Sequence, residues 1–239
     1  MRPHDLVGEA AVQVGFRPST STLLHVYAAA VGDPALGALP YMVRASSEEF
    51  AEGPFAYDVQ ESLHSATRVA TLGFSSQPFA IEGGVFHHSV TTGRHTTIDD
   101  GNIDSWSARV TINPFGPFSL QASHGALGDA NIKVNSASAS FGSQSAAVSA
   151  IWTEVGEQRS MAVEALGRIS ITTLMARAEN IKAQERTHVT IGAIVDFARR
   201  SAMRAGIGVN VDYHTRTKQL SSAYGHKPQS IYVFARVRA

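Results

Sequence analysis

Polar and apolar residues alternate with a period of two along most of this chain. The segment from Ser105 to Asn113 alternates without a break, and residues 203 to 213 show the pattern most clearly. In that second segment the apolar parity holds Met203, Ala205, Ile207, Val209, Val211 and Tyr213, and the other parity holds Arg204, Gly206, Gly208, Asn210 and Asp212. Successive side chains of a strand point to opposite faces, so the pattern predicts strands with one apolar and one polar face.

About thirteen segments of this kind follow one another, each with roughly the 8 to 12 residues that a tilted membrane-spanning strand needs. The predicted strands cover residues 5–16, 22–31, 65–74, 79–90, 104–113, 118–126, 132–141, 146–156, 161–169, 172–180, 187–197, 203–214 and 230–238. The boundary near Ser170 has no Gly, Pro or Asn to mark a turn. It is therefore the weakest boundary of the series.

The connections between these segments alternate in length. Short ones cover 17–21, 75–78, 114–117, 142–145 and 198–202, and longer ones cover 32–64, 92–103, 181–186 and 215–229. Aromatic residues fall near the strand ends, namely Phe16, Phe74, Phe79, Phe118, Phe141, Phe197 and Phe234. Short turns on one rim, long loops on the other and an aromatic girdle are typical of an outer-membrane β-barrel.

A soluble β-sandwich with one buried face would give the same alternation. Against a sandwich stand the alternation of short and long connections and the many charged residues on the inward parity. These charged residues are Glu9, Glu82, Arg109, Glu164, Arg177, Glu179, Asp196, Arg204 and Asp212. We therefore predict an all-β, antiparallel transmembrane β-barrel in which these nine residues line a polar lumen. Because both signs are mixed, they favour a structural hydrogen-bonded network and only weak charge selectivity.

The amino-acid composition excludes several other classes of protein and site. The chain has 239 residues, of which 44% are hydrophobic and 17% charged, and its formal net charge is zero, so nucleic acid is not an expected partner. It has no cysteine, which excludes thiolate metal sites, cysteine nucleophiles and disulfides. No window reaches the roughly 18 consecutive apolar residues of a spanning helix.

Several stretches resemble a family of largely uncharacterised bacterial outer-membrane β-barrel proteins. They are Asn102 to Pro114, Phe118 to Gly125 and Ala223 to Arg238, with further landmarks at Arg2 to Leu6, Gln60 to His64 and Glu82 to Phe86. The resemblance spans nearly the whole chain and implies a location in the outer membrane, but it carries no established activity. Longer members hold additional strands and a signal peptide before the region that corresponds to Arg2.

The sequence begins with a strand-like run and shows no signal peptide. We therefore expect a single barrel domain over residues 1–239 that lacks its N-terminal part. Single-chain bacterial barrels have an even number of strands, so an odd number should precede Arg2. The family resemblance suggests about three, which would give roughly sixteen strands and an aqueous channel.

The longest connection, residues 32–64, contains two capping-box spacings, Ser46 with Glu49 and Asp58 with Glu61. Loops of this length in compact domains are usually functional or disordered. Our hypothesis is that this outer loop folds over or into the mouth of the barrel and narrows it. The alternative is a surface loop with two helical turns.

Ten histidines raise the question of a metal site, above all His87, His88 and His95 around one loop, with His4 and His64 on the same rim. Neighbours in a strand point to opposite faces, so His87 and His88 cannot close a site by themselves. Ser123 and His124 cannot form a nucleophile–base pair for the same reason. We expect no metal, no cofactor and no catalytic residue.

The function that these features favour is a porin-like channel for passive diffusion of small polar solutes or ions. The alternative is a non-conducting structural or binding barrel of the outer membrane, with or without an associated metal. The expected partners are the lipid bilayer and small polar solutes, and a homo-oligomer is possible.

Overall fold

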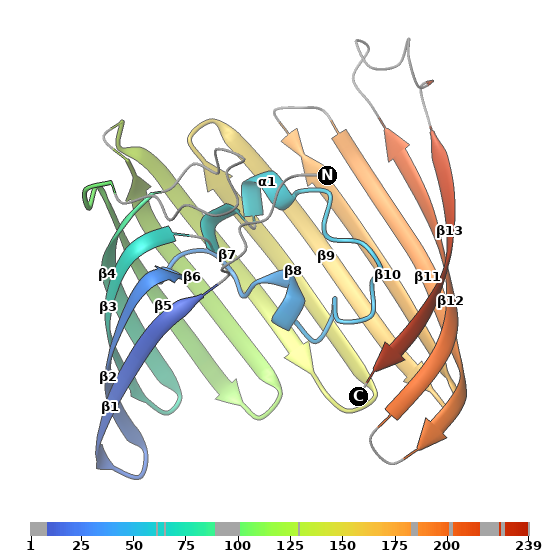
Figure 1. Ribbon diagram of the computed structural model, residues 1–239, viewed down its shortest axis with the longest axis horizontal. Helices are drawn as coiled ribbons and strands as arrows, with labels where there is room; N and C mark the ends of the chain where they lie inside the picture. Colours follow the sequence, from blue (N-terminus) through green and yellow to red (C-terminus); the bar gives the residue numbers. More distant parts are fainter. Residues whose placement is uncertain are drawn as a thin grey trace. The chain divides into compact units, whose positions relative to one another are not determined.

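The computed structural model describes residues 9–60, 62–64, 66–88, 101–128, 130–182, 186–200, 203–215, 225 and 228–238. Within them, thirteen antiparallel strands form one sheet in which each strand neighbours the next along the chain, from β1 to β13 (Figure 1). The strands are β1 Ala10–Ser19, β2 Thr22–Gly32, β3 Ala66–Ser76, β4 Phe79–His87, β5 Ser105–Phe115, β6 Phe118–Leu127, β7 Ile132–Gly142, β8 Ala146–Val155, β9 Gln158–Ile169, β10 Thr172–Ile181, β11 Arg186–Arg200, β12 Met203–Thr215 and β13 Gln229–Arg238. The predicted antiparallel all-β fold is confirmed.

Three short helical turns lie in the long connection between β2 and β3. They are η1 Tyr41–Val43, α1 Tyr57–Gln60 and η2 Ser62–His64. No helix among the described residues has the length and apolar character needed to cross a bilayer.

Strand boundaries agree with the predicted ones to within a few residues. The weakly marked turn between β9 and β10 consists of Ser170 and Ile171, and Ser170 adopts a left-handed conformation with φ of 53°. Glycine or asparagine usually occupies this conformation and marks a turn in the sequence. Because a serine occupies it here, the sequence showed no turn signal at this position. For the first predicted strand, only the part from Glu9 onward lies within the described residues.

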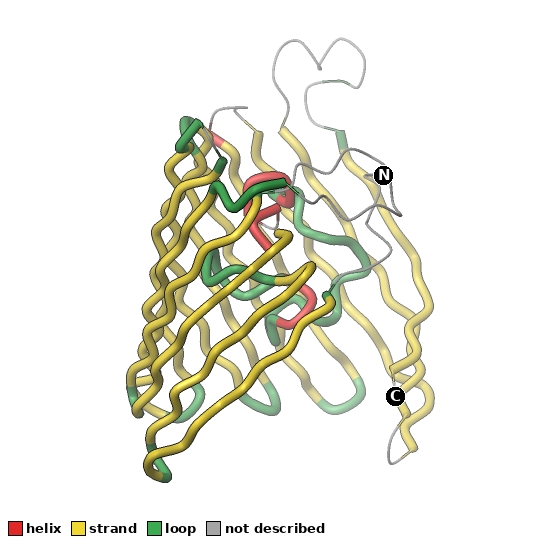
Figure 2. Tube along the Cα trace, turned by 60° about the vertical axis from the view of Figure 1, so that its left-hand side comes forward, coloured by secondary structure: helices red, strands yellow, loops and turns green. Residues whose placement is uncertain are grey.

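Connections at one end of the strands are tight. Two residues separate β1 from β2, β3 from β4, β5 from β6 and β9 from β10, and Figure 2 shows such turns in green at the lower strand ends. The opposite ends carry the long connections 33–65, 88–104 and 216–228. They also carry three short ones, 128–131, 156–157 and 182–185, so connection length alternates less strictly than the sequence predicted.

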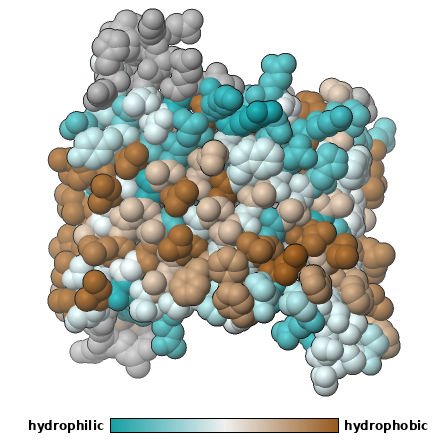
Figure 3. All heavy atoms as spheres, turned by 180° about the vertical axis from the view of Figure 1, so that it is seen from behind, coloured by the Kyte–Doolittle hydropathy of each residue, from teal (hydrophilic) through white to brown (hydrophobic). Residues whose placement is uncertain are grey.

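One face of the strands is apolar and exposed. On β12, Ile207 is 56% exposed and Val209 40%, whereas Asn210 and Asp212 are each 2% exposed on the other face. Figure 3 shows hydrophobic residues spread over the strands, with hydrophilic side chains gathered above them. An apolar face of this extent is one that lipid covers in a membrane barrel.

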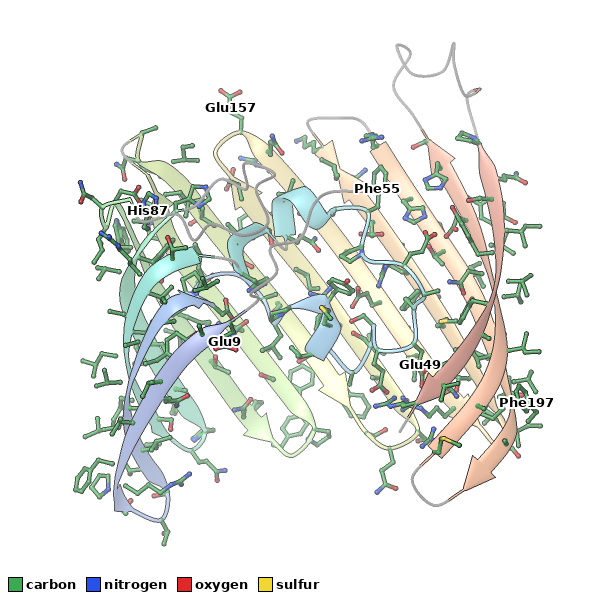
Figure 4. All side chains as sticks on the ribbon, viewed as in Figure 1. Glu9, Glu49, Phe55, His87, Glu157 and Phe197 are labelled. Carbon is green, nitrogen blue, oxygen red and sulfur yellow. The ribbon has the colours of Figure 1, made fainter. Side chains whose placement is uncertain are left out.

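Phenylalanines at the tight-turn ends carry the aromatic girdle. Phe16 is 66% exposed, Phe197 is 70% exposed and points outward (Figure 4), and Phe115 stacks on Phe118 with 5.6 Å between ring centroids. Phe234 was wrongly assigned to this girdle. It lies on the polar parity of β13, and a Cβ at Gly208 would meet its Cζ at 2.4 Å. The glycine therefore makes room for the ring on the inner face.

The chain forms two compact units. Unit 1 comprises Met1–Ala38, Val59–Ser138 and Thr153–Glu157, and unit 2 comprises Leu39–Asp58, Ala139–Trp152 and Gln158–Ala239. The predicted single domain over residues 1–239 and the predicted total of about sixteen strands stay predictions.

The inner face of unit 1 carries a hydrophobic cluster. Leu36 and Leu63, from the two ends of the β2–β3 connection, are 0% and 3% exposed and belong to a cluster that includes Phe86 and Val134. Nearby, the backbone N–H of Gly37 donates to Ser123 Oγ over 2.9 Å. Apolar packing therefore fixes both ends of this connection to unit 1.

The assigned facing of β12 can be tested at Val209. Val209→Arg should lower the free energy of unfolding by about 2 to 4 kcal/mol if the position lies near the middle of the bilayer, since lipid does not solvate the guanidinium. Val209→Leu, measured in the same lipid vesicles by urea titration, is the control and should change stability little. Equal stability of the two variants would contradict the assignment.

Candidate functional site

Residues Leu39–Asp58, called the inner segment below, belong to unit 2 and lie against the polar face of its strands (Figure 1). Backbone turns shape the segment locally. The N–H of Val43 donates to Pro40 O, and the N–H groups of Ser47 and Phe50 donate to Arg44 O and Ser47 O. Side chains and amides of the segment then reach charged residues on β9 to β13, and these contacts form the candidate site.

A buried carboxylate anchors the start of the inner segment. Glu164 on β9 is 0% exposed and accepts a two-pronged contact from Arg44, with Nε–Oε2 of 3.0 Å and Nη2–Oε1 of 3.1 Å. Arg177, its cross-strand neighbour on β10, donates from Nε to Oε1 over 3.1 Å. Bidentate charge-assisted bonds of this type are among the strongest in proteins. One carboxylate therefore joins two strands and the segment.

The capping box predicted at Ser46 and Glu49 does not form a helix; the residues after η1 make turns. Ser46 Oγ instead donates to Glu164 Oε2 at 3.0 Å and lies 2.8 Å from the Ser149 hydroxyl. Both side chains of the motif bind strand residues, so they do not cap local N–H groups. Of the second motif, Asp58 lies inside α1 and Glu61 lies outside the described residues.

Two neighbouring glutamates of the inner segment face arginines of the strands. Glu49, labelled in Figure 4, is 3% exposed and forms an ion pair with Arg236 on β13. Glu48 pairs with Arg168 on β9 and, over 2.7 Å, with Arg238 Nη2 on β13. The acidic pair thus forms ion pairs with three strand arginines and offsets two of their three charges.

Asp196 on β11 adds a second acidic partner for Arg236. Arg204 lies directly opposite Arg238 in the register of β12 and β13. The cluster is therefore a network of several charges of both signs, in which each pair is also held by its neighbours.

The end of the inner segment is held by backbone amides. The N–H groups of Phe55 and Ala56 donate to Oε2 and Oε1 of Glu179, each over 3.0 Å. Glu179 lies on β10 and is 2% exposed. A carboxylate with two backbone donors on separate oxygens resembles the anchoring of an anion by consecutive amides.

Glu179 also meets His188, its cross-strand neighbour on β11, with Nδ1–Oε2 of 3.1 Å. The other ring nitrogen of His188 lies 3.2 Å from Asp212 Oδ1 on β12. Thr190 Oγ1 donates to the same Asp212 oxygen over 2.5 Å. A continuous polar chain therefore runs from the inner segment across β10, β11 and β12.

Glu52, in the inner segment, has a raised pKa, first because burial penalises its charged form and second because Asp212 is close. Its carboxylate consequently takes up a proton at a higher pH than an ordinary glutamate. Its backbone carbonyl accepts a bond from Arg177 Nη1 over 3.1 Å.

The predicted polar-face residues of unit 1 also meet in pairs. Arg109 Nε donates to Glu82 Oε2 over 2.8 Å, and His25 Nε2 lies 3.5 Å from the other Glu82 oxygen. Glu9, which precedes β1, accepts a hydrogen bond of 2.7 Å from Tyr27 Oη. All nine predicted residues are thus in the described structure, and their role in lining a lumen stays a prediction.

Sequence reasoning missed several members of the network. On β9, Arg168 sits on the same parity as the predicted Glu164, so parity alone could have found it. Arg236 lies on the polar parity of β13, a strand in which no lumen residue was predicted. Arg44, Glu48 and Glu49 have no periodic signal, because they lie in a connection. The partners of a loop charge depend on the path of the loop.

The histidines proposed for a metal site are partly outside the described residues, which applies to His4 and His95. His87 Nδ1 lies 2.8 Å from Asp104 Oδ2, and the backbone N–H of His88 donates to Oδ1. Burial raises the pKa of Asp104, but the bonds from Ser105 and His88 outweigh it and leave that pKa lowered. Among the described residues, no group of three or more His, Asp or Glu side chains is arranged so that it could hold a metal ion.

The fold is similar to solved bacterial porins. OmpF of Salmonella typhi, solved in complex with daunomycin, aligns with a TM-score of 0.56 and 10% identity over 96% of this chain and 89% of that one. An anion-selective porin from Comamonas acidovorans aligns with a TM-score of 0.50 and 10% identity, covering 95% and 88%. No protein-family model and no curated protein matches the chain.

At this level of identity the likeness concerns the fold alone, and it defines the class: a porin-like transmembrane β-barrel protein. The coarse part of the sequence-based resemblance, to bacterial porin-like barrels, is confirmed. Membership of an uncharacterised family stays a prediction.

Glu164 is the residue on which the first anchor depends. Glu164→Gln should lower the free energy of unfolding by about 3 to 5 kcal/mol, because it removes the charge that two buried guanidinium groups share. Glu157→Gln, in the exposed β8–β9 turn (Figure 4), is the matched control and should be neutral. Urea unfolding of both variants in detergent measures the difference. An unchanged free energy of unfolding in Glu164→Gln would show that the contacts of Glu164 with Arg44 and Arg177 do not stabilise the fold.

Proposed function

We propose that this protein is a porin-like channel of the bacterial outer membrane, through which small polar solutes or ions diffuse passively. The porin fold, the exposed apolar strand faces and the polar opposite faces support this function. In this proposal the protein lies in the lipid bilayer and assembles with further copies of the chain. No catalytic role is proposed.

The inner segment is the observation that carries the proposal. It is bound along the polar face of unit 2 by Glu164 at its start and by Glu179 near its end. A connection that is fixed to the inner wall by buried ion pairs occupies space that solutes would otherwise use. We therefore propose that the inner segment narrows the channel.

Charge on the wall should bias transport only weakly, because acidic and basic groups neutralise one another. Glu48 and Glu49 compensate arginines on β9 and β13. The exposed part of this cluster includes Arg238, whose side chain is 45% exposed. Small polar solutes of either sign, or none, fit such a wall better than a strongly charged substrate does.

One observation favours the alternative, a non-conducting structural or binding barrel. The ends of the β2–β3 connection bring Leu36 and Leu63 into the hydrophobic cluster on the inner face of unit 1. Apolar side chains on that face exclude water where a channel needs it. Planar-bilayer recordings separate the two functions: discrete conductance steps support the channel, and a folded but silent protein supports the alternative.

Removal of the inner segment tests its role directly. Deletion of residues 45–57 should raise single-channel conductance, because the obstruction is removed while Arg44 and the strands remain. Long connections cost little free energy to shorten, so the barrel should still fold and keep its heat-dependent mobility in gel electrophoresis. Unchanged conductance of a correctly folded deletion variant would show that the segment does not narrow the channel.

The acidic pair should set ion preference. Replacing both Glu48 and Glu49 by Gln leaves Arg168, Arg236 and Arg238 with fewer carboxylates, so the reversal potential in a salt gradient should shift toward anions. Glu157→Gln again serves as the control and should leave the reversal potential unchanged. A shift toward cations, or none, would contradict the assigned role of the pair.

A further inference from the structure

His188 has an unusual environment, in which a carboxylate oxygen faces each ring nitrogen. Nδ1 lies 3.1 Å from Glu179 Oε2, and Nε2 lies 3.2 Å from Asp212 Oδ1. A neutral imidazole has one N–H and one lone pair, whereas the imidazolium has two N–H groups. Only the charged ring can donate to both carboxylates, so the geometry fits the imidazolium.

The other bonds of the two carboxylates support this protonation state. Glu179 accepts from the N–H groups of Phe55 and Ala56, which can only donate, so both of its oxygens act as acceptors. Thr190 Oγ1 also lies 3.3 Å from His188 Nε2, but its single proton goes to Asp212 Oδ1 over 2.5 Å, so the hydroxyl does not serve Nε2 as a donor. Two acceptor carboxylates on either side of a neutral ring would leave a lone pair facing an oxygen, which is unfavourable in a buried site.

Aromatic contacts orient the ring. His188 is stacked on His214 of β12 with 4.3 Å between centroids and 5° between planes. Phe55 of the inner segment lies 5.4 Å from the His188 ring. The guanidinium of Arg186 lies over the same Phe55 ring, with 4.6 Å between Cζ and the ring centroid.

The charged and titratable groups around the ring come from each neighbouring element. They are Glu179 on β10 with Arg177 beside it, Arg186 on β11, Asp212 and His214 on β12, and Glu52 in the inner segment. The ring lies between carboxylates of two strands, so its positive charge is compensated at short range.

We infer that His188 is held as an imidazolium and is the positioning residue that keeps Glu179 in place to bind the Phe55 and Ala56 amides of the inner segment. Its role in transport rests on the proposed channel function, whereas its role in anchoring does not. The ring meets the segment through Glu179 and through the Phe55 ring, and only the contact with Glu179 depends on the charge of the imidazole, so neutralising the ring loosens that end of the segment.

The direction of the pH effect follows from the charge. The anchor is complete when the ring is protonated, and it weakens as pH rises and the ring loses its second proton. Protonation of Glu52 occurs on the acid side and has a different cause, so it does not produce a loss of anchoring at rising pH.

The protonation state is measured first. In histidine-selective ¹⁵N spectra of the folded protein in micelles at pH 6, both ring nitrogens of His188 should show the signature of an imidazolium. The signal is assigned by its loss in His188→Gln. A ring with one bare nitrogen would overturn the inference, including the case in which Asp212 carries the proton.

Hydrogen exchange measures the anchoring. After correction for intrinsic exchange, protection of the Phe55 and Ala56 amides should fall about ten- to a hundredfold as pH rises through the titration of the ring, the range expected for loss of a charge-assisted bond. In His188→Gln the protection should be low and independent of pH. His124→Gln, a histidine on the apolar face bonded to Asn135, is the matched control and should retain the wild-type profile.

His214→Phe keeps a ring in the stack but removes its titration, so the pH transition should persist in that variant. Loss of the transition in His214→Phe, or its survival in His188→Gln, would overturn the inference. If His188→Gln does not fold, the pH profile of exchange at the Phe55 and Ala56 amides in the wild-type protein and in His214→Phe still decides the question.

Conductance separates this inference from the proposed function. If the protein conducts, wild-type conductance should change with the same pH transition and His188→Gln should not respond. A silent protein with the expected exchange profile contradicts the channel function alone, whereas a conducting protein without a pH-dependent exchange profile contradicts the role of His188 alone.

Discussion

Compensation of charge on the polar face of unit 2 is the constraint on which the site depends. Glu164 and Glu179 are both almost fully buried, and an isolated ionised carboxylate in such a place is strongly unfavourable. Each is stabilised only when strand partners and the inner segment contribute donors together. The same contacts therefore stabilise the strands and fix the path of a long connection.

The two ends of the inner segment use different donors for one purpose. At its start Arg44 supplies a guanidinium to Glu164, and near its end the Phe55 and Ala56 amides supply neutral donors to Glu179. The inner segment supplies no cation to Glu179 among these contacts, and His188 on β11 supplies the positive charge. This difference places an imidazole in the later anchor, whereas the cation of the first anchor is a guanidinium, which stays charged.

The two units stabilise the β2–β3 connection by different physics. In unit 1 its ends pack through Leu36 and Leu63 into the hydrophobic cluster. In unit 2 its middle is bound to the strands by ion pairs and by hydrogen bonds from backbone amides. Apolar packing is not directional and does not depend on pH, and the charged contacts are both directional and titratable. A connection held in this way has fixed ends and a middle whose position responds to charge.

The sequence by itself determined the strands and their facing, because lipid on one side and polar surroundings on the other impose a period of two that local residues reveal. Met203 to Tyr213 is predicted with its correct faces, and even the unmarked turn at Ser170 falls at the right place. Cross-strand pairs such as Glu164 with Arg177 lie on the predicted polar parity.

Only the tertiary structure decided where the connection between β2 and β3 runs. Ser46 and Glu49 have the spacing of a helix cap, yet their side chains bind Glu164 and Arg236, because buried charges more than 100 residues away offer stronger partners than local amides do. Phe234 was misplaced for a related reason: its ring fits over Gly208 on the neighbouring strand. Such contacts depend on register and on the path of the chain in space, and the order of residues along one segment does not contain them.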